Sequence, residues 1–260
     1  MTSVEAAAIG RRREPWWAIA AIFVAGFAAL CLLLASPVLI RAFLFQPFNI
    51  PSSSNIPTLL VGDVFFVSKY SYGYSRFTWP LPWPTGLPPS ARIWGATPAR
   101  GDVVAFFLPK DDATVYIKRV VGLPGDRVQM KDGVLYINDT AVARERVEDL
   151  TGEAACGGDA NERVKRWRET LPNGASYETL DCLDHGFFDN TNVFVVPSGR
   201  LFMLGDNRDN STDSRVLGTI GYVPIENVIG RAAMIFFSAA AAEKGKPGRV
   251  RFERIGTLVR

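Results

Sequence analysis

The chain has 260 residues, of which 48% are hydrophobic and 21% are charged, and its formal net charge is +3. This length is sufficient to bury a sizeable hydrophobic core in one large domain or in two small ones. Because the net charge is small and the basic residues form no long block, nucleic acid is excluded as an expected partner.

The first predicted element is an apolar segment at residues 16–40, which contains no charged side chain. A helix of about 20 apolar residues can span a bilayer, whereas the apolar region of a cleavable signal peptide has about 7 to 15 residues. We therefore predict a transmembrane anchor in the lipid bilayer, with a cleaved signal peptide and a buried helix as the alternatives. Pro37 lies near its end, where a membrane helix tolerates a kink.

The charges on either side of this segment predict its orientation. Arg11, Arg12 and Arg13 precede it, and basic residues are enriched in the cytoplasmic flanks of membrane helices. We therefore expect residues 1–15 to form a cytoplasmic tail and everything after Arg41 to lie outside the cytoplasm.

A location outside the cytoplasm permits disulfide bonds. Cys156 and Cys182 follow the predicted anchor, whereas Cys31 lies within it and is expected to be an inert apolar filler. We predict that Cys156 and Cys182 are paired. Two free thiols are the alternative, since a sequence does not show the geometry that a disulfide needs.

A proline-rich segment at residues 72–89 contains Trp79 and Trp83. Amphipathic aromatic rings are enriched at membrane interfaces. We expect these two rings to reach the membrane interface, with packing against the protein body as the alternative.

Beyond the anchor, short segments rich in valine, isoleucine, phenylalanine and tyrosine alternate with turn residues, a pattern typical of antiparallel β structure. Asp132-Gly133 predicts a tight hairpin, and Leu123-Pro124-Gly125-Asp126 predicts a type II turn. The apolar run at residues 232–242 is too short to span a bilayer and is expected to be a strand. The other predicted strands are residues 64–70, 102–108, 114–121, 127–130, 134–137, 193–196 and 201–204.

The predicted fold is mainly β. The sequence becomes charged and loop-like at residues 144–192, which indicates an excursion from the main sheet. We expect an antiparallel β core formed by residues 42–126 and 198–260, with residues 127–197 inserted as a β/loop subdomain. One transmembrane helix precedes this core.

A serine and a lysine are the candidate catalytic residues. A serine hydroxyl needs a base within hydrogen-bond reach, but the one histidine, His185, lies in the loop-like stretch and the chain has no G-x-S-x-G elbow. A lysine can replace histidine when burial lowers its pKa. Strand alternation places Lys118 on the same face as Tyr116 and Val120, where it is a candidate for burial. A solvated lysine at a sheet edge is the alternative.

Two more polar segments accompany this strand. Residues 51–58 contain three serines between two prolines, which alone indicate only a constrained turn. The acidic spacing of residues 205–215 suggests calcium, but Arg208 and Ser211 stand where an EF-hand needs an acid or amide and a glycine. We therefore expect no metal and no other cofactor.

Taken together, residues 51–58, 116–119 and 205–215 resemble the corresponding segments of bacterial signal peptidase I, a membrane-anchored endopeptidase that removes signal peptides from exported preproteins. The string GDNRDN-S-x-DSR is specific, and the resemblance covers nearly the whole chain from the apolar segment onward. It implies that Ser54 is the nucleophile and that neutral Lys118 is the general base. It also implies a catalytic domain on the periplasmic, extracytoplasmic face of the bacterial inner membrane.

The resemblance implies further roles. Ser211 would hold the amine of Lys118, and the hydroxyl of Ser52 with the backbone N–H of Ser54 would form the oxyanion hole. The signal peptide would lie extended beside the serine and lysine segments as an added strand, with small side chains in shallow apolar pockets. The charged residues expected to support the site are Asp206, Arg208, Asp213 and Arg215. The residues expected to form the pockets are Phe48, Ile50, Pro51, Leu59, Tyr116 and Ile117.

Two positions depart from the family's usual Pro-Ser-Gly-Ser-Met. Ser53 replaces the glycine, which removes backbone freedom if a positive φ is needed, and Asn55 brings a polar amide to an apolar pocket position. Two other functions are consistent with these residues. One is an anchored β-rich module that binds extended peptides without cleaving them, and the other is a peptidase specialised for one exported substrate.

Overall fold

The computed structural model describes residues 15–157, 163–240 and 248–260, and it divides into two units, residues 1–41 and 42–260. The first unit contains helix α1 (Trp16–Leu39), which includes Pro37, and a π-helical turn, η1 (Ile40–Leu44), follows it in the chain. The helix is long and apolar enough to cross a membrane, as predicted for residues 16–40. The three arginines and the rest of the predicted cytoplasmic tail before Pro15 lie outside the described residues.

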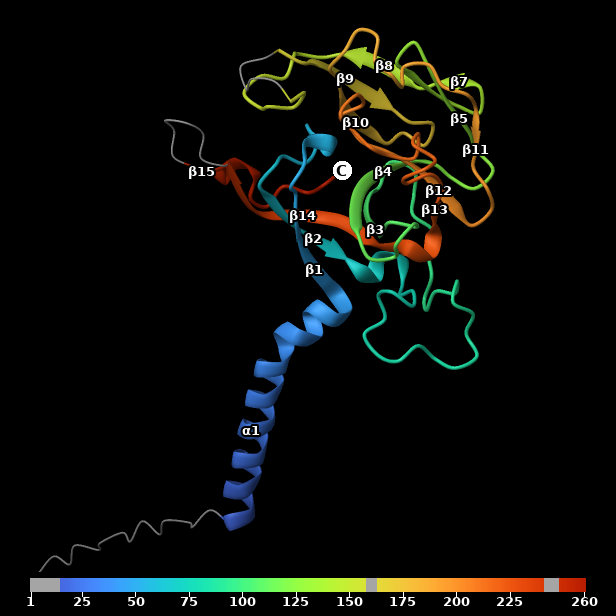
Figure 1. Ribbon diagram of the computed structural model, residues 1–260. Helices are drawn as coiled ribbons and strands as arrows, with labels where there is room; N and C mark the ends of the chain where they lie inside the picture. Colours follow the sequence, from blue (N-terminus) through green and yellow to red (C-terminus); the bar gives the residue numbers. More distant parts are fainter. Residues whose placement is uncertain (1–14, 158–162, 241–247) are drawn as a thin grey trace, which may run out of the picture. The chain divides into compact units, whose positions relative to one another are not determined.

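The second unit is built on a large antiparallel sheet (Figure 1). Its strand order is β1-β2-β14-β3-β4-β12-β13, and β15 pairs with β14. The strands are β1 (Phe45–Asn49), β2 (Asp63–Ser68), β3 (Val103–Phe107), β4 (Val115–Gly122), β12 (Arg200–Leu204), β13 (Val223–Pro224), β14 (Val228–Ala240) and β15 (Arg249–Val250). The short helical turns are η2 (Ser53–Asn55), η3 (Lys69–Tyr72), η4 (Ile225–Asn227) and η5 (Phe252–Arg254).

Two smaller antiparallel sheets have the strand orders β11-β5-β6-β7 and β10-β9-β8. Figure 1 shows them together at the end of the unit that lies beyond β4 and β12. Their strands are β5 (Arg127–Lys131), β6 (Val134–Ile137), β7 (Thr140–Ala141), β8 (Ala143–Arg146), β9 (Lys165–Thr170), β10 (Ser176–Asp181) and β11 (Phe194–Val195). All of these strands fall within residues 127–197, the stretch expected to be inserted.

The charged stretch at residues 144–192 is less loop-like than its composition suggests, because β8, β9 and β10 form a sheet there. Arg166 and Arg168 of β9 both pair with Glu178 of β10. Opposite charges on neighbouring strands stabilise a sheet, so these strands form without the hydrophobic alternation by which strands are usually found.

Both predicted turns are confirmed. Asp132 and Gly133 have φ values of 47° and 72° and connect β5 to β6, whose Lys131 and Val134 are paired. In the second turn, Gly125 has a φ of 90° and the N–H of Asp126 donates to the carbonyl of Leu123 at 3.0 Å. These positive φ values favour glycine and aspartate in tight turns.

The hydrophobic core continues from the large sheet into the smaller ones. One buried cluster combines Val121, Phe202 and Leu204 of the large sheet with Val128 and Leu135 of the four-stranded sheet. The residues predicted as an insertion therefore share a core with the strands that lead into the polar segment 205–215. The pairing of β12 with β4, in which Leu204 lies opposite Arg119, places the start of that segment beside the strand that contains Lys118.

The proline-rich segment packs in part against the second unit. Trp79 contacts the rings of Phe43 and Tyr74 edge-on, and Nε1 of Trp83 donates to the carbonyl of Leu87. Both tryptophans are half-buried, whereas Trp94 is 77% exposed. The expectation that Trp79 and Trp83 reach a membrane interface stays a prediction.

Candidate active site

Ser54 lies in the short turn η2, which connects β1 to β2. The ends of this connection are held together because the N–H of Ile50 donates to the carbonyl of Asp63, and the N–H of Gly62 donates to the carbonyl of Ile50. The backbone N–H of Asn207 donates to the carbonyl of Ser54 at 3.1 Å. The turn is thus fixed both to its own strands and to the polar segment 205–215.

Lys118 lies on β4 with its amine beside this serine. Its Nζ is 2.6 Å from Oγ of Ser54, and its side chain is only 3% exposed. Burial lowers the pKa of Lys118 to about 8, and the negative charges of Asp213 and Asp206 oppose part of this shift. A substantial fraction of the amine is therefore neutral slightly above neutral pH, and a neutral amine can accept a proton from a serine hydroxyl.

Ser52 and Ser211 lie close to this pair. Oγ of Ser52 is 3.3 Å from Oγ of Ser54. The hydroxyl of Ser211 is buried and has no hydrogen-bond partner in the part of the chain that the structure describes, so its contact with the amine of Lys118 stays a prediction. A Cβ on Gly205 would lie 2.2 Å from Oγ of Ser211 and 2.6 Å from the carbonyl oxygen of Ser54. Glycine is therefore needed at position 205 for this close approach.

A buried ion pair lies behind the lysine, on the opposite face of β4. Nε and Nη2 of Arg119 each donate to the carboxylate of Asp206 at 2.7 Å, and the hydroxyl of Thr58 donates to the same carboxylate at 2.6 Å. The Arg119 guanidinium also stacks over the ring of Tyr177 at 4.0 Å. This network connects β4, the connection between β1 and β2 that contains Ser54, and the segment 205–215.

Three other charged residues of segment 205–215 also form buried ion pairs. Arg208 donates to the carboxylate of Glu169 on β9, and Arg215 donates to Asp213 through Nε at 2.9 Å and Nη2 at 2.8 Å. Asp213 accepts a further hydrogen bond from the N–H of Gly205. The four charged positions named from the sequence therefore hold the shape of this segment and its contact with the smaller sheets.

A cleft of about 500 Å³ opens beside the serine and the lysine. Among its lining residues are five of the six predicted pocket residues: Phe48, Ile50, Pro51, Tyr116 and Ile117. Leu59 does not line this cleft; it is fully buried and packs in the core cluster that contains Ile50. The cleft thus combines an apolar wall with the polar atoms of the candidate catalytic pair.

The family model described as signal peptidase, peptidase S26, matches residues 19–237. The chain belongs to this family. Signal peptidase I of Rickettsia typhi is 40% identical over 219 residues, which cover 82% of this chain and 79% of that protein. Signal peptidase I of Rickettsia akari is 39% identical over 233 residues, covering 87% and 80%. A solved signal peptidase I from Enterococcus faecalis V583 is 31% identical and covers 52% of this chain and 97% of that one, with a TM-score of 0.31.

As a member of the signal peptidase family, the chain is a serine peptidase. One edge of β4 is left partly unpaired beside the cleft. Strand β12 pairs with β4 only from Arg119 to Gly122. Among the described strands, none pairs with residues 115–118 on that side, and this stretch lines the cleft. Residues 115–118 therefore form a sheet edge beside Lys118, where Asn55 donates to the carbonyl of Ile117.

The two departures from the usual signal peptidase turn are accommodated. Ser53 belongs to the turn η2 and is not among the described residues with positive φ, so the backbone does not require glycine there. Asn55 is buried, lines the cleft, and donates from Nδ2 to the carbonyl of Ile117 at 2.7 Å. That hydrogen bond connects the turn η2, which contains Ser54, directly to β4, which contains Lys118.

Several residues of the signal peptidase site were missed in the sequence. Arg119 and Thr58 lie in the segments 116–119 and 51–58, but the sequence assigned no role to either of them in the buried network. Glu169 lies in the charged stretch, where no sequence pattern distinguishes it from its neighbours. Cys156 and Cys182 are joined in a disulfide, with their Cα atoms 5.8 Å apart, and Cys31 is free. Among the described residues, no group of three or more histidine, cysteine, aspartate or glutamate side chains could hold a metal ion.

Proposed function

We propose that this chain is a membrane-anchored serine endopeptidase that cleaves N-terminal signal peptides from exported preproteins, with Ser54 as the nucleophile and neutral Lys118 as the general base. The observation that carries the proposal is the 2.6 Å contact between Nζ of Lys118 and Oγ of Ser54 at a buried lysine. A fully solvated lysine would remain protonated near neutral pH and could not accept the serine proton.

The proposed reaction uses these residues in turn. Oγ of Ser54 attacks the carbonyl carbon of the scissile bond while its proton moves to Nζ of Lys118. The resulting ammonium then protonates the leaving amine, and a water activated by the same amine hydrolyses the acyl-enzyme. The hydroxyl of Ser52 and the backbone N–H of Ser54 would stabilise the oxyanion, and each such donor contributes about 3 to 4 kcal/mol. Ser211 would orient the amine.

The cleft supports a signal peptide as the substrate. An extended chain would pair with the open edge of β4 at residues 115–118, and its small side chains would enter the apolar part of the cleft beside Ile50 and Ile117. The bound peptide would also exclude water from Lys118. The apolar helix α1 would hold this unit at the bilayer, with the tail in the cytoplasm and residues after Arg41 on the periplasmic face of the bacterial inner membrane.

The direct test is incubation of the full chain in detergent with one purified preprotein, followed by amino-terminal sequencing of the product. We expect a single cleavage after a small side chain. Stable binding of the preprotein with no product would instead support a peptide-binding module. Cleavage of one preprotein from a panel of several would indicate a specialised processing peptidase.

The rate should rise with pH as the buried ammonium loses its proton. Because burial lowers the pKa of Lys118 to about 8, we expect kcat/KM to increase through a midpoint near pH 8, well below the value of about 10.4 for a free lysine. The measurement is the pH dependence of kcat/KM for a preprotein.

Lys69 offers a matched control for this profile, because it is a second buried lysine whose pKa is lowered by burial, and its Nζ donates to the carbonyl of Ala42. Lys69→Met should leave the midpoint unchanged. A midpoint above pH 10 in the unmodified chain would contradict the assignment of Lys118 as the base. A midpoint that shifts in Lys69→Met would contradict it as well.

A further inference from the structure

We propose that Asn210, held by the carbonyl of Ala155 beside the Cys156–Cys182 disulfide, positions the nucleophile turn through the hydroxyl of Ser53. Ser53 and Asn210 are positioning residues, since they act on the reaction through the placement of Ser54. This inference rests on the proposed function, because it concerns how the serine is held for attack.

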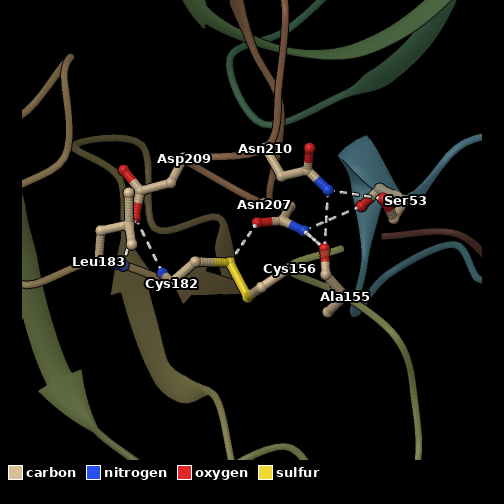
Figure 2. Close-up of a disulfide and its surroundings, with 8 residues drawn as sticks. All are labelled: Ser53, Ala155, Cys156, Cys182, Leu183, Asn207, Asp209 and Asn210. Carbon is tan, nitrogen blue, oxygen red and sulfur yellow. Dashed lines mark hydrogen bonds between the residues drawn. A yellow bond between two sulfur atoms is a disulfide. The ribbon is translucent and has the colours of Figure 1, made fainter. Parts of the chain in front are cut away.

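Asn210 bridges the nucleophile turn and the segment that contains the disulfide (Figure 2). Its Nδ2 donates to Oγ of Ser53 at 2.8 Å and to the carbonyl oxygen of Ala155 at 2.8 Å. A side-chain amide has two N–H donors, and both are used here. The hydroxyl of Ser53 is therefore held in one place relative to the Ala155 carbonyl.

Asn207 makes a parallel bridge between the same two residues. Its Nδ2 donates to the carbonyl of Ser53 at 3.2 Å and to that of Ala155 at 2.7 Å, and its backbone N–H donates to the carbonyl of Ser54. Asn207 is fully buried. Two asparagines of the segment 205–215 thus hold both the backbone and the side chain of the turn, and Ala155 is their shared acceptor.

The disulfide adds a second connection between Ala155 and the segment 205–215. Ala155 precedes Cys156, which is bonded to Cys182. The backbone N–H groups of Cys182 and Leu183 donate to the carboxylate of Asp209 at 2.8 Å and 2.9 Å, and Asp209 is the neighbour of Asn210 (Figure 2). The Ala155 carbonyl is consequently connected to Cys182 through the disulfide, and Cys182 is held to the segment 205–215 by hydrogen bonds.

The hydrogen bond from Asn210 gives the side chain of Ser53 a role that glycine at the same position would lack. A glycine has no hydroxyl to accept from Asn210, so only the backbone contacts from Asn207 would remain. A small displacement of a reacting group can lower a rate by about 100-fold. Loss of the Ser53 anchor should therefore affect the chemical step more than the binding of substrate.

Variants of the full chain in detergent test this inference. Ser53→Ala and Asn210→Ala should each lower kcat by about 10-fold while KM changes by less than about twofold. The double variant should lose no more than the more impaired single variant, because both substitutions remove the same hydrogen bond. Asn210→Leu is similar in size but has no donor and no acceptor for the Ser53 hydroxyl, so it should match Asn210→Ala.

Three results would overturn the inference. Unchanged kcat in Ser53→Ala would show that the hydroxyl holds nothing. Losses that multiply in the double variant would show independent roles. An effect of Asn210→Ala on KM alone would show that Asn210, which also lines the cleft, contacts the substrate instead.

Reduction tests the contribution of the disulfide. Dithiothreitol donates two electrons, converting the bond between Cys156 and Cys182 into two thiols while it becomes a cyclic disulfide. Thiol titration of the unfolded chain should then rise from one to three, since the chain has three cysteines. We expect kcat to fall severalfold in the unmodified chain and to fall less in Asn210→Ala, where only the bridge through Asn207 still depends on the Ala155 carbonyl. Equal activity of the oxidised and fully reduced chains would contradict the role of the disulfide.

The variant Cys156→Ser/Cys182→Ser controls for other effects of the reductant. It should have the kcat of the reduced chain and should not respond to dithiothreitol. If its thermal transition shows that it does not fold, the comparison of reduced and oxidised wild type decides. No cleavage by the unmodified, oxidised chain would instead refute the proposed function, whereas full cleavage by all variants would refute only this inference.

Discussion

Ser54→Ala should lower kcat/KM for a preprotein by at least about 10⁴-fold, since the proposed nucleophilic oxygen is removed. Oγ of Ser54 lies 2.6 Å from the buried amine of Lys118. Oγ of the neighbouring Ser52 lies 3.3 Å from Oγ of Ser54 and does not take its position. The measurement is the initial rate of preprotein cleavage in detergent. An unchanged thermal transition would show that the fold is intact.

Lys118→Met should cause a comparable loss, because methionine retains most of the apolar stem but cannot accept a proton. A nucleophile and its base act as one unit, so the double variant Ser54→Ala/Lys118→Met should be about as inactive as either single variant. Retention of more than about a hundredth of the activity in either single variant would rule out this pair as the catalytic residues.

Asp206→Ala should lower the free energy of unfolding by about 3 to 5 kcal/mol, because it leaves the buried guanidinium of Arg119 without its counter-charge. Arg119 is 1% exposed and its partner Asp206 is 2% exposed. Removal of the carboxylate also takes the acceptor from the hydroxyl of Thr58. The measurement is chemical unfolding of the full chain in detergent, followed by tryptophan fluorescence.

Arg127→Ala is the matched control, because it removes one partner of an exposed ion pair. Arg127 and Asp139 are 49% and 65% exposed, and such surface pairs contribute about 0 to 1 kcal/mol. If the two variants were equally stable, the Arg119–Asp206 pair would not be holding segment 205–215 against β4.

The buried amine also weighs against a module that only binds peptides. Burial of a lysine disfavours its charged form and so opposes folding at neutral pH. A module that holds an extended peptide against a sheet edge needs no such residue. Placement of the amine within reach of a serine hydroxyl is instead the arrangement that proton transfer requires.

Local pattern was sufficient to predict many of the elements. The apolar helix, the strands around Phe65, Val104 and Lys118, and the hairpin at Asp132-Gly133 all follow from hydrophobic composition, alternation and turn chemistry, which act over a few neighbouring residues. β1 was missed because its five residues show no clear alternation, and β8 to β10 were missed because their strands are charged.

By itself, the sequence determined many of the strands and both of the predicted turns, and it placed Lys118 and Arg119 on opposite faces of one strand. Only the tertiary structure decided that both faces are buried, with Arg119 paired to a residue 87 positions away and Asn210 bonded to one 157 positions away. The reason is physical: alternation is a property of one strand, whereas burial and pairing depend on which distant segments cover that strand.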